Sequence, residues 1–317
     1  MLQVKLIFTQ IKKSINCFLI LLKETYKMVT ETGKKVQEFY NEIPFPDYDL
    51  NRFNCKEDLK LAMWDFAGVI DRSIPQDANI IDVGTGTGQL SAYLSLRRRK
   101  VVGIDFSDSS LNKAKALKKK LGLNSWYLRK IDILNEEQIN EIIKEFGQFD
   151  YVLCLGVLHH TGNAEQGFIN ILKLLKPNGK IIIGLYNKIG RIPLKVRIFL
   201  AKTIFKNNDK IKDYFIRIQI GETEDKERAR GWWHDQYMHV HETTHYIGEV
   251  RRWFRKNKIK YLQTIPASDF SGDYIYNISG IFIKENYSNF IIRFFRQLTW
   301  LWKTQREGGY WLTCGEK

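Results

Sequence analysis

Short apolar runs alternate with helical stretches along the middle of the chain, from residue 78 to residue 187. The apolar runs predict strands over Asn79–Val83, Lys100–Asp105, Ser125–Arg129, Tyr151–Leu155 and Lys180–Leu185. Between them, apolar positions at helical spacing predict helices over Gln89–Leu96, Ser109–Leu121, Glu136–Phe146 and Ala164–Leu175. Pro177-Asn178-Gly179 predicts a turn before the fifth strand. This alternation is typical of an α/β fold with a parallel sheet covered by helices on both faces.

The alternation ends after Tyr186, and a basic, largely helical insertion is predicted over residues 188–235. The remaining chain predicts a helix over Thr244–Asn257, a strand over Lys260–Thr264, an aromatic helix around Phe290–Trp302 and a last strand near Tyr310–Thr313.

At the N-terminus, residues 4–26 place apolar side chains at helical spacing and keep the lysines off that stripe. Residues 1–27 therefore predict a basic amphipathic helix. Two interpretations stay open: attachment to a membrane surface, or a helix that packs on the domain or extends upstream of a chain beginning at Met28. The longest apolar run there, Cys17–Leu22, is too short to span a bilayer, so we expect peripheral membrane contact at most.

The formal net charge is +15, and two segments supply most of it. Residues 188–260 hold 18 Lys and Arg against 9 Asp and Glu, and residues 1–27 hold 5 against 1. This charge suits nucleic acid, an anionic membrane surface or an anionic substrate without choosing among them. The four cysteines lie far apart and form no C-x-x-C pair, which disfavours a disulfide framework and predicts a cytoplasmic protein, with membrane association as the alternative.

The first predicted strand ends in Asp82-Val83 and turns through Gly84, Gly86 and Gly88 into a helix. Glycines at these places leave no Cβ where a ligand approaches the backbone. Asp105 ends the next strand, where a carboxylate can accept hydrogen bonds from both hydroxyls of a ribose. Folds that bind a dinucleotide use G-x-G-x-x-G, whereas this chain has G-x-G-x-G preceded by Asp82, which would repel a pyrophosphate. An adenosyl ligand with a cationic amine suits Asp82 better.

The segments IIDVGTGTGQL, VVGIDFS, KIDI and FDYVLCLGVLHHTGN, in this order and spacing, resemble the class I S-adenosylmethionine-dependent methyltransferases. Four further segments are similar to a bacterial subgroup of the methyltransferase domain of types 11 and 12: KPNGKIIIGLYNKIGR, YNEIPFPDYD, WWHDQYMHVHE and REGGYWLTCG. The resemblance implies a Rossmann-like, mostly parallel sheet of seven strands in the order 3-2-1-4-5-7-6, with a helical lid inserted between strands 5 and 6. The chain then divides into an N-terminal helix (1–27), a helical cap (28–77), a cofactor-binding core (78–187), a substrate lid (188–243) and a C-terminal completion of the fold (244–317).

The resemblance also implies the residues that hold S-adenosylmethionine. The methionine portion would be held by Asp82, Gly84, Gly86 and Gly88, and the ribose by Asp105. The adenine would lie with one face on Phe106 and its edge at Asp132 and Ile133. The methyl donor would be bordered by Leu155 and Gly156. For Asp132 the alternative is a turn or helix-capping residue, and for Phe106 it is core packing.

Two adjacent histidines, His159 and His160, follow the fourth strand, at the sheet edge where open α/β sheets bind ligands. A histidine can take a proton from a weakly acidic acceptor near neutral pH, although either one could instead cap the next helix or bond a backbone carbonyl. Tyr186 and Asn187, after the fifth strand, are placed to line the acceptor site.

Four of the six histidines lie within residues 234–245. We expect a polar and aromatic lid over the acceptor, to which Trp233, His234, Tyr237 and His239 contribute. Metal binding is the alternative, but the histidine spacing matches no strong zinc pattern, so we expect no metal.

The predicted function is methyl transfer to oxygen or carbon of a small or lipid-like acceptor. RNA methylation is one alternative, supported by the basic insertion but not by any added RNA-binding module, and an N/D-P-P-Y/F motif is absent. A protein that binds S-adenosylmethionine without turnover is the other. The pattern makes no prediction of the oligomeric state.

Overall fold

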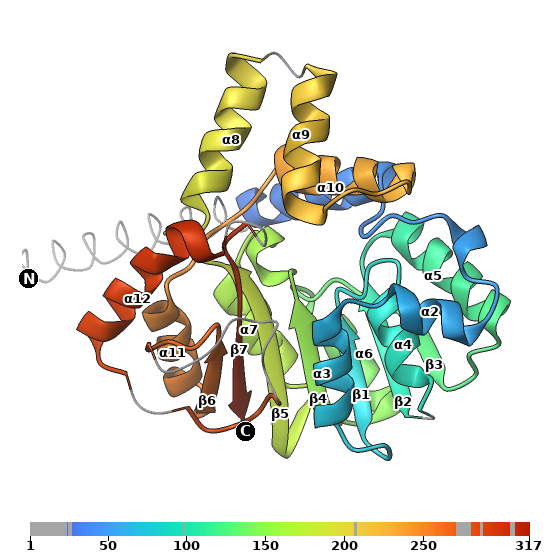
Figure 1. Ribbon diagram of the computed structural model, residues 1–317. Helices are drawn as coiled ribbons and strands as arrows, with labels where there is room; N and C mark the ends of the chain where they lie inside the picture. Colours follow the sequence, from blue (N-terminus) through green and yellow to red (C-terminus); the bar gives the residue numbers. More distant parts are fainter. Residues whose placement is uncertain are drawn as a thin grey trace, which may run out of the picture.

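A seven-stranded sheet in the order β3-β2-β1-β4-β5-β7-β6 forms the centre of the computed structural model (Figure 1). The structure describes residues 24, 27–97, 99–205, 208–270, 280–285, 288–304 and 308–317. The strands are β1 (Asn79–Val83), β2 (Lys100–Asp105), β3 (Trp126–Lys130), β4 (Phe149–Leu155), β5 (Leu175–Tyr186), β6 (Lys260–Ile265) and β7 (Tyr310–Glu316). Strands β1 to β5 pair in parallel, and β7 runs antiparallel to both β5 and β6. The predicted fold class and strand order are confirmed.

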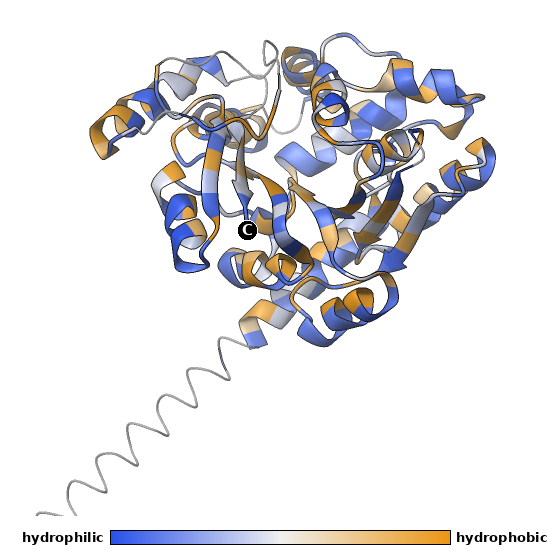
Figure 2. Ribbon diagram, turned by 90° about the horizontal axis from the view of Figure 1, so that it is seen from below, coloured by the Kyte–Doolittle hydropathy of each residue, from blue (hydrophilic) through white to orange (hydrophobic). Residues whose placement is uncertain are grey.

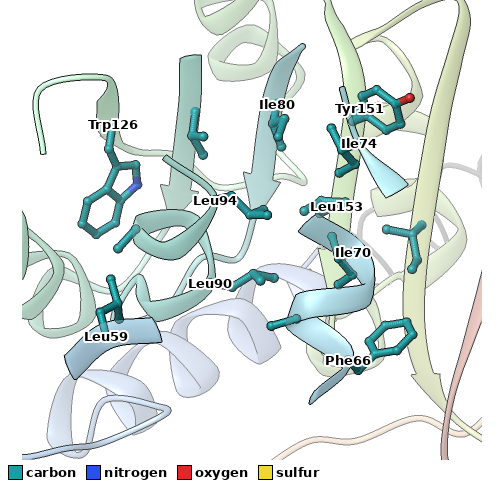
Figure 3. Close-up of a cluster of buried hydrophobic side chains, with 14 of the residues drawn as sticks. Leu59, Phe66, Ile70, Ile74, Ile80, Leu90, Leu94, Trp126, Tyr151 and Leu153 are labelled. Carbon is teal, nitrogen blue, oxygen red and sulfur yellow. The ribbon is translucent and has the colours of Figure 1, made fainter. Parts of the chain in front are cut away.

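Helices cover both faces of the sheet. They are α2 (Lys56–Ala62), α3 (Asp65–Ser73), α4 (Gln89–Ser95), α5 (Asp108–Leu121), α6 (Glu136–Phe146), α7 (Ala164–Leu172), α11 (Ile247–Lys256) and α12 (Phe290–Lys303), with short 3-10 turns η1 (Leu50–Arg52) and η2 (Leu158–His160). Residues 27–42 are also helical. One buried cluster joins the sheet to α2–α5, and Figure 3 shows its side chains from α2, α3, α4 and the strands. A second cluster joins the other face to α6, α7, α11 and α12.

The strand β1 shows why both faces must be covered. Successive strand residues point to opposite faces, and Ile80 and Ile81 are both fully buried, Ile80 in the first cluster and Ile81 in the second. A strand buried on both sides has a nearly continuous apolar run, as the sequence shows here. The hydropathy colouring in Figure 2 places hydrophobic segments along the central strands and hydrophilic ones mainly on outer helix faces.

Several element boundaries differ from the prediction by one to five residues, most of all at the start of β5. Strand β5 begins at Leu175 instead of Lys180, and Pro177-Asn178-Gly179 lies within it as an irregularity instead of before it. The pairing with β4 passes from Phe149–Leu175 to Tyr151–Lys180 across this segment. Extra residues on one strand are accommodated in this way as a bulge. The helix α7 correspondingly ends at Leu172, and β3 begins one residue late, at Trp126.

The insertion between β5 and β6 contains α8 (Ile192–Thr203), α9 (Asp209–Ile220) and α10 (Lys226–Tyr237). These helices stand beyond the edge where β5 ends, and the helix of residues 27–42 lies beside α10 (Figure 1). They have a small core of their own, built around Leu194, Phe215, Trp233 and Tyr237.

The amphipathic helix predicted for residues 1–27 lies, except for residues 24 and 27, outside the described part of the chain. Within the described part, no helix is both long enough and apolar enough to cross a bilayer.

Candidate active site

The glycine turn between β1 and α4 has the conformation that its sequence predicts. Gly84, Gly86 and Gly88 have φ values of 68°, 56° and 83°, in the left-handed region that favours glycine. A Cβ added at Gly84 would lie 2.2 Å from Cγ2 of Val157, and one added at Gly86 would lie 2.2 Å from the carbonyl oxygen of Phe45. The turn is therefore a close-packed cradle in which no side chain fits at these two positions.

The Asp82 carboxylate is buried at the start of this turn. Its Oδ2 accepts a hydrogen bond of 2.8 Å from the hydroxyl of Thr85, which lies 2.6 Å from the hydroxyl of Ser91. Burial raises the pKa of Asp82 to about 7, and these hydroxyls only partly oppose the rise. A buried carboxylate whose partners are neutral is suited to a cationic group of a ligand.

Asp105, at the end of β2, holds the glycine turn directly. Its Oδ2 accepts the N–H of Gly86 at 2.9 Å, and its Oδ1 accepts the N–H of Ser107 at 2.8 Å. Burial raises its pKa, against the effect of these backbone donors. Each carboxylate oxygen has a second lone pair, so the pair of oxygens fits a ligand with two neighbouring hydroxyls. The carboxylates of Asp82 and Asp105 therefore match the cationic amine and the ribose hydroxyls of the expected cofactor, S-adenosylmethionine.

A segment that the sequence did not assign to the site, residues 37–48, crosses the turn; we call it the strap. The side chain of Gln37 donates to the carbonyl of Phe106 at 2.6 Å. The hydroxyl of Thr87 donates to the carbonyl of Pro46 at 2.6 Å, and Tyr48 donates to the carbonyl of Thr87 at 3.0 Å. The only signal for the strap was the family-like segment YNEIPFPDYD.

The other predicted cofactor residues lie at the same sheet edge. Asp132 is exposed after β3, where its Oδ1 accepts the N–H of Leu134 at 2.9 Å, and Ile133 beside it is buried. Leu155 and Gly156 are half-buried at the end of β4, and Gly156 has a φ of 80°. Phe106 is half-buried directly after Asp105.

The two predicted catalytic histidines occupy different environments. His159 is 0% exposed, and neither of its ring nitrogens has a hydrogen-bond partner. Its ring lies 4.4 Å from that of Tyr186, centroid to centroid. Burial, and then the charges of His160 and Arg191, lower the pKa of His159 far below its usual 6.5. His159 is therefore a neutral core residue.

His160 has a defined tautomer. Its Nδ1 lies 3.0 Å from the backbone carbonyl oxygen of His241, in the segment predicted as a lid (residues 188–243). Because a carbonyl only accepts, Nδ1 carries the proton and Nε2 of the neutral ring has a free lone pair. Burial lowers the pKa of His160, so the ring is neutral near pH 7, while Asp235 acts in the opposite direction.

A hydrogen-bonded chain lies beside His160, whose ring stacks on that of His239 at 3.7 Å. Nδ1 of His239 accepts the N–H of His241 at 3.0 Å, so its proton is on Nε2, 3.1 Å from the hydroxyl oxygen of Tyr40. Tyr40 in turn donates to Oδ1 of Asp235 at 2.8 Å. The chain runs from His239 through Tyr40 to the Asp235 carboxylate, and joins the strap to the lid.

Among the described residues, His160, Asp235 and His239 have potential metal-ligand atoms within 4.8 Å of one another. A metal ion at this place would need an unprotonated nitrogen from each histidine. His160 offers one, but Nδ1 of His239 accepts a backbone N–H and its Nε2 carries the proton. The hydrogen bonds therefore fit a proton network better than a cation.

The predicted acceptor residues do not form one cluster but make contacts in different parts of the structure. Trp233 and Tyr237 stack on each other at 4.3 Å inside the lid core, and His234 stacks on Phe39 at 3.8 Å. The hydroxyl of Tyr186 accepts from Gln236 at 2.7 Å.

Asn187 is fully buried after β5. Its Oδ1 accepts the N–H groups of Ile189 and Gly190, both at 3.0 Å, and its Nδ2 donates to Gln297 at 2.8 Å. Of the predicted acceptor residues, His239 and Tyr186 contact the histidine pair.

Residues 81–181 match the family model described as a methyltransferase domain. Over 110 residues the chain is 33% identical to the ubiquinone biosynthesis O-methyltransferase of Rickettsia conorii, covering 34% of this chain and 35% of that protein. Over 109 residues it is 34% identical to the ubiquinone biosynthesis O-methyltransferase of Dechloromonas aromatica, covering 34% of this chain and 44% of that protein. The matched region thus spans less than half the length of these relatives.

Among solved structures, the chain is similar to PKMT2 from Rickettsia typhi, with a TM-score of 0.53 and 15% identity. The similarity covers 85% of this chain and 54% of that one. At this identity it supports the fold alone.

Proposed function

Residues 81–181 belong to the class I S-adenosylmethionine-dependent methyltransferases, and from this premise we propose that the chain transfers a methyl group to oxygen or carbon of a small or lipid-like acceptor. The observation that carries the proposal is the tautomer of His160, which leaves an unprotonated Nε2 at the carboxyl end of β4. A base in this position serves an acceptor that must lose a proton.

In this proposal the glycine turn and the strap enclose S-adenosylmethionine. Asp82 faces its cationic methionine portion, and Asp105 accepts from its ribose hydroxyls. The remaining contacts are assigned to Gly84, Gly86 and Gly88 for the methionine portion, Phe106, Asp132 and Ile133 for the adenine, and Leu155 and Gly156 for the region of the methyl donor. The buried, neutral-partnered carboxylates support this assignment.

When bound, S-adenosylmethionine supplies an activated methyl group on a sulfonium, which is already a good leaving group. The protein therefore has to orient the acceptor, exclude water and remove a proton. Nε2 of His160 takes the proton from the acceptor hydroxyl or carbon acid. Asp235 stabilises the resulting imidazolium, because its negative charge raises the pKa of His160.

The aromatic surroundings support a planar acceptor. Five rings contact one another where the strap, the sheet edge and the lid meet: those of Tyr40, His159, His160, Tyr186 and His239. A phenolic acceptor would match these faces and provide the acidic proton. The matched relatives are named for O-methylation in ubiquinone biosynthesis, which supports oxygen as the acceptor atom. His239, Tyr186, Asn187, Trp233, His234 and Tyr237 remain the proposed acceptor-side residues.

The test combines cofactor titration with a labelled-methyl assay on fractionated cell extract. Calorimetry should detect binding of S-adenosylmethionine and of its demethylated product. Label should appear in the lipid or small-molecule fraction with the wild-type chain, and much less with His160→Gln. Label in RNA would replace the proposed acceptor class with RNA, and binding without any transfer of label would replace catalysis with a binding role.

A further inference from the structure

The helix α12 exposes most of its apolar side chains to solvent. Ile291, Phe295 and Trp302 lie on one stripe and are 63%, 54% and 61% exposed, and Phe294 on the same stripe is also exposed. On the opposite side, Arg296, Gln297 and Trp300 are buried, so a single large apolar side chain of this helix anchors it in the core. A helix that packs on a domain normally turns most of its apolar side chains inward.

The two inward-facing polar side chains of α12, Arg296 and Gln297, are hydrogen-bonded to other parts of the protein. Nε of Arg296 donates to the carbonyl of Ala267 at 3.0 Å. Oε1 of Gln297 accepts from the side chain of Asn187 at 2.8 Å and from the N–H of Ile247 at 3.2 Å. These bonds fix the rotation of the helix, so the apolar stripe cannot turn inward without breaking them.

The neighbouring helix α8 also presents apolar side chains to solvent. Ile192, Val196 and Phe199, spaced four and three residues apart, are exposed. Helix α8 begins beside the C-terminal end of α12 and extends away from it at the periphery of the molecule (Figure 1). Exposed apolar patches rimmed by polar groups mark interaction surfaces.

The charge on these two helices identifies the partner. Neither α8 nor α12 contains an Asp or a Glu. Apart from the buried Arg296, they carry Lys195, Arg197, Lys202, Arg293 and Lys303. Cores of protein–protein interfaces are depleted in lysine, whereas Trp, Phe and aliphatic residues flanked by Lys and Arg are typical of helices that lie in the interface of an anionic bilayer.

We propose that the apolar stripe of α12, with that of α8, docks the protein on the surface of an anionic membrane. The stripe from Ile291 to Trp302 extends over about 16 Å of helix, so α12 would lie in the plane of the headgroups. This surface belongs to other parts of the sequence than the predicted helix of residues 1–27, and it does not depend on the identity of the methyl acceptor.

Vesicle co-sedimentation of the full-length chain tests the proposal. We expect binding to vesicles that contain phosphatidylglycerol, weaker binding at high salt, and little binding to phosphatidylcholine alone. The double variant Phe294→Ser/Phe295→Ser should weaken binding by on the order of tenfold. Leu61→Ser, which removes an exposed leucine from α2, is the matched control and should bind normally.

A second measurement locates the contact. Brominated lipids should quench tryptophan fluorescence, and Trp302→Phe should remove part of that quenching. Unchanged binding of the double variant, unchanged quenching in Trp302→Phe, or no vesicle binding at all would each overturn the proposal. A chain that forms dimers, loses them in the double variant and ignores vesicles would assign the surface to a second copy instead.

Discussion

His160 in the core and His241 in the lid are joined by a hydrogen bond of 3.0 Å between the Nδ1 of the first and the backbone carbonyl of the second. The N–H of Thr243 in the same lid segment also donates to the carbonyl of His159 at 2.8 Å. The lid backbone thus selects the tautomer of the proposed base. A hydrogen bond from one ring nitrogen to a backbone carbonyl commonly fixes which nitrogen of a histidine stays unprotonated.

The first prediction concerns the proposed base. His160→Gln should lower kcat by roughly 100-fold or more, because general-base catalysis contributes about that much, while the affinity for S-adenosylmethionine stays near the wild-type value. Initial rates with a phenolic acceptor and calorimetric titration measure the two effects separately.

His241→Ala is the matched control. Its backbone carbonyl remains, so most of the activity should remain although a histidine is lost from the same lid segment. Full activity in His160→Gln would show that this ring does not take the proton.

The pH dependence of kcat follows from the environment of His160. Burial lowers its pKa below the usual 6.5, and the neutral ring is the active form. At saturating S-adenosylmethionine, so that the pKa of about 7 of Asp82 does not limit cofactor binding, kcat should therefore be flat from neutral to mildly alkaline pH and fall only on the acid side, with a midpoint below 6.5. A kcat profile over this range, compared with His160→Gln, tests the assignment; a midpoint above 7 in the wild type contradicts it.

His159 should contribute to the loss of stability in acid. Its folded-state pKa is far below the unfolded value of 6.5, so below that pH the unfolded chain binds a proton that the folded chain does not. The free energy of unfolding should fall by up to about 1.4 kcal/mol per pH unit below 6.5 from this group, and level off above it. Denaturant unfolding at several pH values measures the slope.

His159→Phe keeps a ring in the core and removes the titrating group. Its slope between pH 6.5 and 5 should be shallower than that of the wild type by about one proton. His241→Ala, which changes a histidine outside this buried position, serves for comparison. Equal slopes in the wild type and His159→Phe would mean that His159 is protonated in the folded chain.

Asp105→Ala should weaken S-adenosylmethionine binding by roughly 10- to 100-fold, since hydrogen bonds to a charged group contribute about 1.5–3 kcal/mol. The variant removes the acceptor of the proposed ribose contact and also the partner of the Gly86 N–H. Calorimetry measures the affinity, and circular dichroism checks the fold. Asp108→Ala, an exposed aspartate at the start of the next helix, is the control; unchanged affinity in Asp105→Ala rules out the ribose assignment.

The sequence predicted those parts of the molecule that depend on local pattern. The strand order followed from the family resemblance, and the ends of β1 and β2 placed Asp82 and Asp105 at one edge, because parallel strands bring their carboxyl ends together. Tyr40 and Asp235 are 195 residues apart in sequence and contact each other through the strap and the lid. No periodicity encodes such a contact, so the strap was not assigned to the site.

The histidine pair and α12 show a second limit. The sequence placed His159 and His160 together, but only their neighbours in space distinguish an unpartnered core ring from one held by a lid carbonyl. In α12 the apolar stripe was visible as an aromatic helix, and its outward direction follows from the hydrogen bonds of Gln297 to Asn187 and Ile247.

The last prediction compares two glycines with similar backbones. Gly86 and Gly122 have φ values of 56° and 62°, so alanine at either position is strained by about 1–2 kcal/mol. At Gly122 a Cβ would meet nothing within 4 Å, and at Gly86 it would lie 2.2 Å from the carbonyl oxygen of Phe45. In Gly122→Ala the free energy of unfolding should therefore fall only by the cost of the strained backbone, and the variant should bind S-adenosylmethionine normally. Gly86→Ala should lose more stability and, because the strap must move away from the turn, most of its cofactor affinity. Thermal unfolding and calorimetry on both variants decide the matter: equal losses would mean that the strap does not pack on the glycine turn.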